Sequence, residues 1–234
     1  MIKITPLASS SKANAYLISD GKTPLLLECG IRFTELRKAC NFRLSSMAGC
    51  LLSHSHQDHA KSAKDLIKAG IDIYTSQGTA EALSLSGHRL HIVKAEAPFK
   101  INSWMVYAYN TIHDAPEPLE FLLMSGGNRI RFITDTAYTK YQIAGITHLM
   151  IEINYQDEIL DQNIKDGKVP YVMKKRLLHS HLSLKNACEF LRANDLSRLK
   201  AVYLLHLSDG NSNAEEIKKT VQGITGKQTY IVDA

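Results

Sequence analysis

The sequence predicts an α/β fold in which two β-sheets lie face to face and helices cover their outer sides. Three observations lead to this prediction. Short apolar segments recur along the chain, a few amphipathic segments with helical spacing are spread among them, and no linker rich in Pro, Gly or Ser divides the 234 residues. Many strands with interspersed helices pack most simply as layers around one core. We therefore expect one domain over residues 1–234.

The expected strands are short apolar runs with turn-forming residues at their ends. They are Ile2–Pro6, Ala15–Ser19, Pro24–Glu28, Gly49–Ser53, Asp72–Thr75, Arg89–Val93, Ser103–Asn110, Leu119–Ser125, Arg129–Thr134, His148–Ile153, Ala201–Leu207 and Gln228–Val232. Two of the connections between them, Asp20-Gly21 and Gly126-Gly127-Asn128, are typical of hairpin turns.

Fewer segments have apolar residues at helical spacing. The expected helices are Thr34–Cys40, His59–Ala69, Leu184–Ala193 and Ala214–Gln222. Ser183 is the expected N-cap of the third helix, and Asn211 or Ser212 that of the fourth. The polar segment Tyr155–Leu178 is expected to be irregular, and it could leave the core to shape a substrate site.

The composition, 44% hydrophobic and 22% charged residues, is typical of a globular protein with a buried core. No apolar run approaches the roughly 20 residues of a membrane span, and the N-terminal residues lack the pattern of a signal peptide. We therefore expect a cytoplasmic protein without membrane contact. The net charge of +5 suits an anionic substrate without establishing one. The four cysteines have no metal or disulfide spacing and are expected to be reduced and buried.

The candidate chemistry begins where the apolar pair Leu51-Leu52 is followed by His54-Ser55-His56-Gln57-Asp58-His59. Residues two apart in an extended chain point the same way, so His54 and His56 can converge on one ion. Asp58 and His59 follow as the chain turns into a helix, and they can reach a second ion. Imidazole and carboxylate ligands suit zinc and also accept manganese or iron. The pattern predicts a metal site; the alternative is a polar surface loop with incidental histidines.

With this HxHxDH pattern the chain resembles the metallo-β-lactamase-fold hydrolases, and the resemblance extends across most of the sequence. It implies an αββα sandwich of two mixed β-sheets flanked by helices. Three later positions match further ligands of the family: His113 in Thr111-Ile112-His113, Asp135 after Phe132-Ile133-Thr134, and His206 after Leu204-Leu205. The resemblance implies two divalent ions, zinc first and manganese as the alternative. Their ligands would be His54, His56, His113 and Asp135 for one ion, and Asp58, His59, Asp135 and His206 for the other.

One position departs from the family pattern. The family usually has an aspartate before the glycine that ends an early strand, where it supports the ligands from behind. This chain has Glu28 in Leu27-Glu28-Cys29-Gly30. A glutamate can still accept a hydrogen bond from a ligand imidazole. Its extra methylene shifts the carboxylate, so we expect Glu28 to alter metal affinity or preference.

Several passages resemble the YycJ-type branch of the family, also called WalJ-like. They are Leu7–Tyr16, His113–Pro116, Glu152–Tyr155, His179–Ser183, and Leu205–Ser208 with Asn211. The branch and its relatives act on phosphodiesters, as DNA exonucleases or, in phage-borne relatives, on cyclic nucleotides. The resemblance therefore implies a nucleotide or nucleic-acid phosphodiester as substrate. We favour cyclic mononucleotides slightly over DNA, because the chain has little room for a nucleic-acid clamp.

A leaving alkoxide needs a proton, and a histidine outside the metal ligands could donate it. We prefer His181 to His179, because His181-Leu182-Ser183 matches the branch more closely; a surface or capping role is the alternative for both. Asp58 is expected to serve catalysis as well as metal binding. Three basic residues just upstream could meet the phosphate or simply form a solvated face: Lys174, Lys175 and Arg176.

Two other functions stay open. The same metal site could hydrolyse a carboxylic ester, a thioester or a lactam. The chain could also be a non-catalytic module that binds metal or nucleotide, although the full set of ligands disfavours this. The resemblance further implies a homodimer, for which the sequence itself shows no feature.

Overall fold

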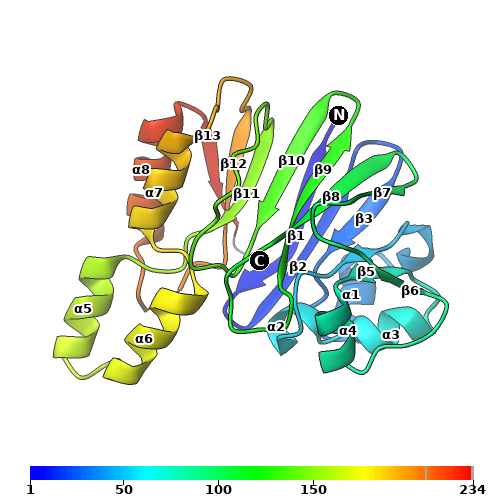
Figure 1. Ribbon diagram of the computed structural model, residues 1–234, viewed down its shortest axis with the longest axis horizontal. Coiled ribbons are helices and arrows are strands. Elements are labelled where there is room, and N and C mark those ends of the chain that lie inside the picture. The colour runs from blue at the N-terminus through cyan, green and yellow to red at the C-terminus, as the bar shows by residue number, and fades with distance from the viewer. Residues whose placement is uncertain (209, 233–234) are drawn as a thin grey trace. The chain divides into compact units, whose positions relative to one another are not determined.

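The computed structural model describes residues 1–208 and 210–232, which form two compact units. The first unit comprises Met1–Asn110 and Ala115–Asn128, and the second comprises Thr111–Asp114 and Arg129–Val232. The described residues contain thirteen strands and eight α-helices (Figure 1). The strands form two mixed β-sheets, one of six strands and one of seven, flanked by helices, so the predicted fold class is confirmed.

The first unit contains a six-stranded sheet whose strands follow one another in chain order. They are β1 (Lys3–Ser10), β2 (Ala13–Ser19), β3 (Pro24–Leu27), β4 (Cys50–Leu51), β5 (Ile73–Thr75) and β6 (Leu90–Ile92). β1, β2 and β3 pair antiparallel, and β3 to β6 pair parallel. Parallel neighbours end at the same edge of a sheet, so the residues after β3 and β4 emerge side by side. Glu28 and the metal motif follow these two strands.

Three more strands of the first unit form an antiparallel meander: β7 (Pro98–Ile101), β8 (Trp104–Asn110) and β9 (Leu119–Ser125). The helices of this unit are α1 (Phe33–Ala39), α2 (Gln57–Ala60), α3 (Ala63–Lys68) and α4 (Gln77–Ala82), with a 3-10 turn at Leu44–Ser46. α3 buries Ala63 and Leu66 in a core that also contains Leu26, Leu36 and Ile73. Its opposite face carries Lys64, Asp65 and Lys68.

The second unit contains four parallel strands: β10 (Asn128–Ile133), β11 (His148–Glu152), β12 (Ala201–Leu205) and β13 (Gln228–Ile231). The apolar run Leu149–Ile151 is fully buried, as is typical of a parallel strand covered on both faces. The helices are α5 (Asp157–Lys165), α6 (Tyr171–Ser180), α7 (Leu184–Ala193) and α8 (Ala214–Thr225). α7 and α8 pack side by side, and α8 contacts β13 (Figure 1).

The single helix expected over His59–Ala69 is wrong, because the structure divides it into α2 and α3. The break lies at Ser62. Its N–H donates to the carbonyl of Cys29 (3.0 Å), and its hydroxyl donates to the carbonyl of Ile31. The carbonyl of His59 in turn accepts from the N–H of Cys29 (2.7 Å). These bonds replace helical ones and tie the metal motif to the residues that follow β3.

The prediction that Tyr155–Leu178 is irregular is also wrong, because α5 and α6 occupy most of it. α5 has Asp157 and Glu158 in its first turn and Lys165 in its last, which complements the helix dipole. Only Leu160 of this helix is fully buried. Its apolar residues Ile159, Leu160 and Ile164 do have helical spacing, and the sequence prediction overlooked them.

Two further elements were not expected from the sequence, α4 and β7. The N-cap of α7 is Ser183, as predicted; its hydroxyl accepts from the N–H of Asn186. The N-cap of α8 is Asn213, whose side chain accepts from the N–H of Glu216, and not Asn211 or Ser212.

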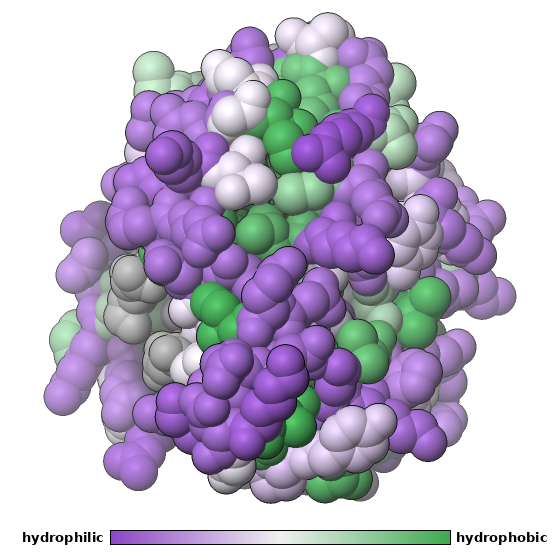
Figure 2. Space-filling model, turned by 90° about the vertical axis from the view of Figure 1, so that its left-hand side faces the viewer, coloured by the Kyte–Doolittle hydropathy of each residue, from purple (hydrophilic) through white to green (hydrophobic). Residues whose placement is uncertain are grey.

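All four cysteines are free and buried, as expected. No helix in the described part of the chain is long and apolar enough to cross a membrane. Figure 2 shows hydrophilic side chains over most of one face, with apolar side chains in patches between them. The single domain over 1–234 and the homodimer stay predictions.

The turn between β2 and β3 is fixed by the carboxylate of Asp20. Its Oδ1 accepts from the N–H groups of Lys22 (2.9 Å) and Thr23 (2.8 Å), and its Oδ2 accepts from the hydroxyls of Ser103 and Ser125 (both 2.6 Å). Burial would raise the pKa of Asp20, but these hydrogen bonds outweigh it and hold the pKa well below its ordinary value. The carboxylate thereby connects β2 and β3 to β8 and β9.

We expect the Asp20→Ala variant to lose about 2 kcal/mol of unfolding free energy at pH 7. Because the pKa of Asp20 is lower in the folded chain than its ordinary 3.8, this contribution is complete above the ordinary pKa and is lost as the pH falls through the folded-state value. Urea unfolding of both proteins at several pH values measures the difference. A difference that stays constant down to pH 2 would contradict the assignment to this carboxylate.

Candidate metal centre

The first unit presents the four residues of the metal motif at the carboxyl edge of its sheet. β4 ends at Leu51, and the chain continues in an extended conformation to His54 and His56 before α2 begins. The rings of His54 and His56 lie 4.8 Å apart, and those of His54 and His59 lie 4.2 Å apart, centroid to centroid. His59 Nε2 lies 3.2 Å from Asp58 Oδ2. The motif thus brings three imidazoles and one carboxylate together.

Asn14 holds this arrangement from β2. Its Nδ2 lies 3.1 Å from His59 Nε2 and 3.4 Å from Asp58 Oδ2. The hydroxyl of Tyr16 donates to Asn14 Oδ1 (3.0 Å), and Ser9 bonds to the same hydroxyl (2.9 Å). Sequence reasoning did not name Asn14 as a site residue. The Asn14-Ala15-Tyr16 passage, noted for its resemblance, was the feature that could have identified it.

Glu28 lies directly behind the motif and is fully buried. Its Oε2 lies 3.6 Å from His59 Nδ1, and its carboxylate accepts from the N–H of Ser53 (3.2 Å to Oε1). Burial raises the pKa of Glu28, and the neighbouring His59 opposes this. A carboxylate here can orient the imidazole of His59, which is the role that the resemblance implies.

Gly30 lets the metal motif approach the end of β3. A Cβ atom at this position would lie only 1.6 Å from the carbonyl oxygen of Asp58. The N–H of Gly30 also donates to the carbonyl of Asn14 (2.8 Å). No side chain can occupy the space between these backbones, so glycine is required by close approach.

We expect Gly30→Ala to displace α2, weaken metal binding and destabilise the protein by about 3 kcal/mol, the upper range for a forced overlap. Metal content after dialysis and the midpoint of thermal unfolding measure both effects. Gly223→Ala in α8 is the matched control, because a Cβ there meets no atom within 4 Å. Equal metal content and melting midpoint in the two variants would contradict the prediction.

The second unit gathers its polar residues at the ends of three parallel strands. Asp135 follows β10, Glu152 ends β11, and His206 follows β12. His206 Nδ1 lies 2.9 Å from Asp135 Oδ1 and 3.2 Å from Glu152 Oε1. Asp135 (φ 37°) and His206 (φ 52°) both have left-handed backbone conformations, as has Glu28 (φ 62°) in the first unit. Such strain in non-glycine residues clusters at functional sites.

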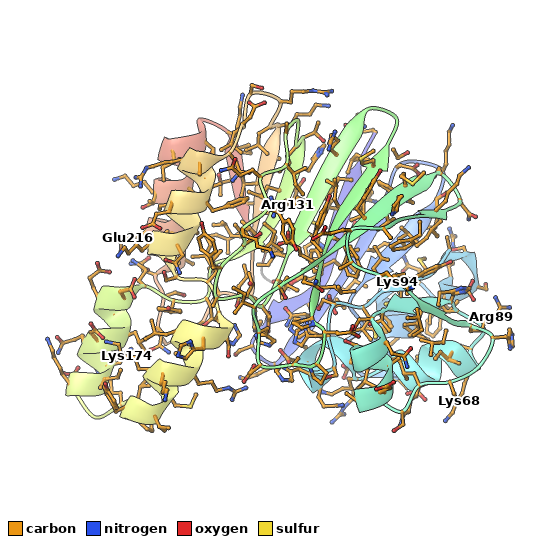
Figure 3. The ribbon with its side chains drawn as sticks, in the orientation of Figure 1. Lys68, Arg89, Lys94, Arg131, Lys174 and Glu216 are labelled. Atoms are coloured by element: carbon orange, nitrogen blue, oxygen red, sulfur yellow. The ribbon has the colours of Figure 1, made fainter. Side chains whose placement is uncertain are left out.

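The loop after Asp135 is anchored by Arg131 of β10 (Figure 3). This buried guanidinium donates to the carbonyl of Tyr141 (2.8 Å) and to the hydroxyl of Thr139 (2.7 Å). The N–H of Thr136 donates to Glu152 Oε2 (3.2 Å). The position of Asp135 is therefore fixed on both sides.

His181 joins this cluster directly after α6. Its Nδ1 lies 2.5 Å from Glu152 Oε1 and 4.0 Å from Asp135 Oδ2. One ligand atom from each of Asp135, Glu152, His181 and His206 lies within 4.8 Å of the others. The sequence analysis did not name Glu152 as a site residue, although the passage Glu152–Tyr155 was noted for its resemblance. No sequence pattern could show that the Glu152 carboxylate contacts two histidines.

The charges in this cluster shift one another's pKa values. Burial would lower the pKa of His206, but Asp135 and Glu152 outweigh it and raise the pKa to about 10. Burial would also lower the pKa of His181, but Glu152 and Asp135 outweigh it and raise this pKa. Burial would raise the pKa of Glu152, but His181 holds it below its ordinary value. The two carboxylates thus favour the protonated forms of both imidazoles.

His113 belongs to the same unit. Its Nδ1 lies 2.6 Å from the carbonyl of Ser180, so this nitrogen carries the proton, and its Nε2 lies 3.5 Å from Asp135 Oδ2. Burial lowers the pKa of His113 despite the nearby Asp135. A neutral imidazole with a fixed tautomer is what a metal ligand requires.

The remaining predicted residues lie on α6, outside this cluster. His179 and Lys175 are exposed. Lys174 forms an ion pair with Asp161, and Arg176 Nε pairs with Asp114 Oδ2 at 3.0 Å. Two of the three basic residues thus already have carboxylate partners.

Both sets of residues fit divalent metal ions by their chemistry. Each combines imidazole nitrogens with carboxylate oxygens, which suits zinc and manganese. In the second unit the ligand atoms are also close enough to share an ion. The residue types at both sites therefore suit the divalent metal ions that the resemblance implies.

The sequence profile of the Beta-lactamase superfamily domain matches residues 24–207, and the chain belongs to this superfamily. The match includes residues of both units and all seven predicted ligands. The chain is a metal-dependent hydrolase.

The more specific likeness is to two bacterial proteins. The chain is 27% identical to exodeoxyribonuclease WalJ of Streptococcus pneumoniae over 230 residues, covering 91% of this chain and 84% of that protein. It is 26% identical to exodeoxyribonuclease YycJ of Bacillus anthracis, covering 96% and 89%. Among solved structures, the metallo-β-lactamase fold protein YhfI of Bacillus subtilis matches with a TM-score of 0.79 at 16% identity, over 100% of this chain and 97% of that one. The predicted family and its WalJ-like branch are thereby confirmed.

Proposed function

We propose that this chain is a two-metal phosphodiesterase that removes nucleotides from the ends of DNA. The observation that carries the proposal is the cluster of Asp135, Glu152, His181 and His206, in which a histidine bonded to a carboxylate stands beside candidate metal ligands. The names of the WalJ and YycJ relatives support DNA as the substrate.

The proposal assigns the seven predicted ligands to two ions. His54, His56, His113 and Asp135 bind one ion, and Asp58, His59, Asp135 and His206 bind the other, with zinc expected first and manganese as the alternative. Two divalent ions supply charge stabilisation to the phosphoryl oxygens of a displacement at phosphorus. Asp58 serves both as ligand and in catalysis.

His181 is the residue that we assign to the proton. Glu152 Oε1 accepts from His181 Nδ1, which fixes the ring and leaves Nε2 as the nitrogen that can donate to the leaving alkoxide. His179, the alternative considered from the sequence, is exposed and lies two residues earlier on α6. The structural arrangement therefore supports His181 in this role.

Degradation of end-labelled linear DNA with Mn²⁺ or Zn²⁺ tests the proposal, with circular single-stranded DNA as the control that has no end. We expect mononucleotides from the linear substrate and no product from the circle. The preference for 3′,5′-cyclic mononucleotides stays a prediction of the sequence, and the same assay with cyclic AMP or GMP tests it. Faster cleavage of a simple carboxylic ester than of any phosphodiester would overturn the proposal.

A further inference from the structure

Two adjoining hollows follow α3 on the surface of the first unit. One has a volume of about 300 Å³ and the other about 220 Å³. Lys64, Ser84 and Leu85 line both, so they form one groove. We propose that this groove, here called the lysine groove, binds the sugar-phosphate backbone of a single nucleic-acid strand. The inference rests on the proposed phosphodiesterase function and assigns its substrate class to a polynucleotide.

One wall of the lysine groove is cationic. Lys64 and Lys68 lie four residues apart on α3, on the side opposite its buried residues, and Lys61 lies in the turn between α2 and α3. All three are exposed, and the side chain of Lys68 extends outward from the helix (Figure 3). Within residues 1–208 and 210–232, no carboxylate pairs with any of these lysines, and none lines either hollow.

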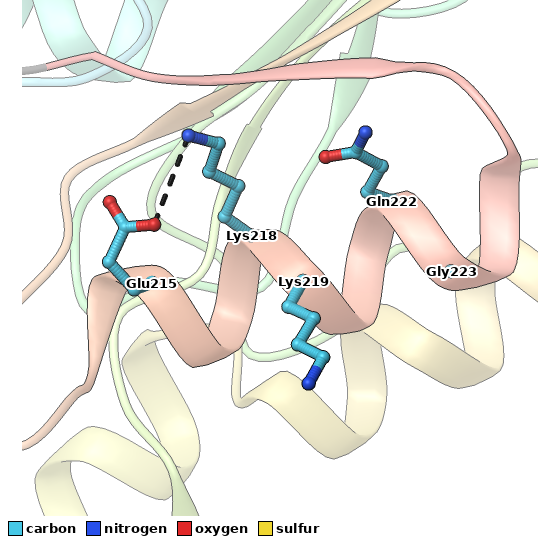
Figure 4. A pocket seen from close by; sticks show the side chains of 5 residues that line it. All are labelled: Glu215, Lys218, Lys219, Gln222 and Gly223. Atoms are coloured by element: carbon cyan, nitrogen blue, oxygen red, sulfur yellow. Dashed lines mark ion pairs between the residues drawn. The ribbon is translucent and has the colours of Figure 1, made fainter.

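This pairing pattern distinguishes the groove from the basic residues Lys174, Arg176 and Lys218. Lys174 and Arg176 on α6 pair with carboxylates, and Lys218 on α8 lies 3.9 Å from Glu215 (Figure 4). A phosphate entering those places would displace an acidic partner. At the lysine groove it would meet lysines that form no ion pair among the described residues, and Asp65, the carboxylate of α3, lines neither hollow.

The other wall offers hydroxyls and apolar surface. It consists of the end of α4 and the residues after it, where Leu85 is buried and Ser84 and Ser86 are exposed. Ser84 has a left-handed backbone (φ 51°), and the N–H of Leu85 donates to the carbonyl of Ala80 (2.9 Å). Serine and lysine side chains are common phosphate partners, and apolar atoms can contact the sugar.

The groove starts at the metal motif. Gln57 and Ala60 of α2 line its first hollow, and His59 lies two residues before Lys61. At a helical rise of about 1.5 Å per residue, Lys64 to Lys68 on α3 spans roughly 6 Å, and Lys61 lies before this helix. A stacked strand carries one phosphate per roughly 3.4 Å, so about two phosphates fit along α3 and a further one lies towards Lys61. A cyclic mononucleotide has only one phosphodiester and could not use this length.

The test replaces the three lysines by glutamine, which keeps most of the aliphatic stem and removes the charge. Affinity for a labelled single-stranded oligonucleotide is measured at several salt concentrations in the presence of a chelator, so that no cleavage occurs. Each lost phosphate contact lowers the slope of log K against log salt by about 0.7, so the K61Q/K64Q/K68Q variant should lose about 2 units of slope and bind roughly a hundredfold more weakly at 0.1 M salt. The single variant K68Q, farthest from the metal motif, should lose about 0.7.

The matched control is K218Q/K219Q on α8, where a hollow of about 300 Å³ is also lined by two lysines (Figure 4). Its salt slope should equal that of the unaltered protein. With metal added, kcat/KM for DNA should fall far more than kcat/KM for bis-p-nitrophenyl phosphate in the triple variant. An unchanged slope in both K68Q and the triple variant would overturn the groove as a binding site.

This experiment separates the two proposals. If the unaltered protein cleaves no phosphodiester at all, the proposed function fails, whereas the salt slope, measured under chelation, still reports on the groove. If the protein cleaves DNA and the lysine variants bind and cleave it normally, the groove fails and the phosphodiesterase stands. Circular dichroism of each variant confirms that the fold is retained.

Discussion

The Asp135→Ala variant is expected to lose phosphodiesterase activity on every substrate, DNA and bis-p-nitrophenyl phosphate alike. Asp135 contacts His206 (2.9 Å) and lies 3.5 Å from His113, and it is the only residue that the proposed function assigns to both ions. The variant should lose several kcal/mol of the transition-state stabilisation that bound metal supplies. At roughly 1.4 kcal/mol per tenfold change in rate, kcat should fall by at least about 10³-fold.

Bound metal per protein chain should fall together with activity. Metal analysis after gel filtration and steady-state kinetics measure the two quantities. Asp166→Ala, at an exposed carboxylate of the same unit, is the control and should bind metal normally. An Asp135→Ala protein with full metal content and activity would remove Asp135 from the site.

The His181→Ala variant should lose activity according to the leaving group. General acid catalysis contributes about 10²- to 10⁴-fold, so kcat for DNA, whose alkoxide leaving group needs a proton, should fall by that factor. Turnover of bis-p-nitrophenyl phosphate should fall much less, because p-nitrophenolate leaves without protonation. Glu152→Gln should show the same selectivity to a smaller degree, since it orients His181 without contacting substrate.

His179→Ala is the matched control for His181→Ala, because it is the neighbouring histidine on α6 and is exposed. Its kinetics should equal those of the unaltered protein. Equal losses on DNA and on the activated ester in His181→Ala would show that His181 acts through metal binding or structure. In that case the proton donor would have to be another group.

The sequence was most informative where ligands follow one another closely. The order of His54, His56, Asp58 and His59 after an apolar strand predicted a metal site by spacing alone. The later ligand positions His113, Asp135 and His206 came from resemblance, because a sequence does not show which strands become neighbours. The strands themselves were largely predictable from short apolar runs, with errors of a few residues at their ends.

The two missed helices differ in the signal that they carry. α6 buries only Ser180 and shows little apolar periodicity, whereas Ile159, Leu160 and Ile164 of α5 have helical spacing that the sequence prediction overlooked. The contacts of Asn14 and Glu152 were missed because each bonds to residues far away along the chain, Asn14 to Asp58 and His59 and Glu152 to His181 and His206. Such hydrogen bonds depend on tertiary packing and leave no local pattern.

The left-handed backbone of Glu28, Asp135 and His206 restricts how this protein can evolve. A replacement there must supply a suitable donor atom and must also tolerate a positive φ angle, which asparagine, aspartate and histidine do more readily than β-branched residues. In a saturation library at Asp135, the surviving protein levels should therefore rank by backbone tolerance, with glycine and asparagine high and valine and isoleucine low. Activity should follow a different order that depends on the donor atom. Folding and catalysis thus place two independent requirements on the residue at this position.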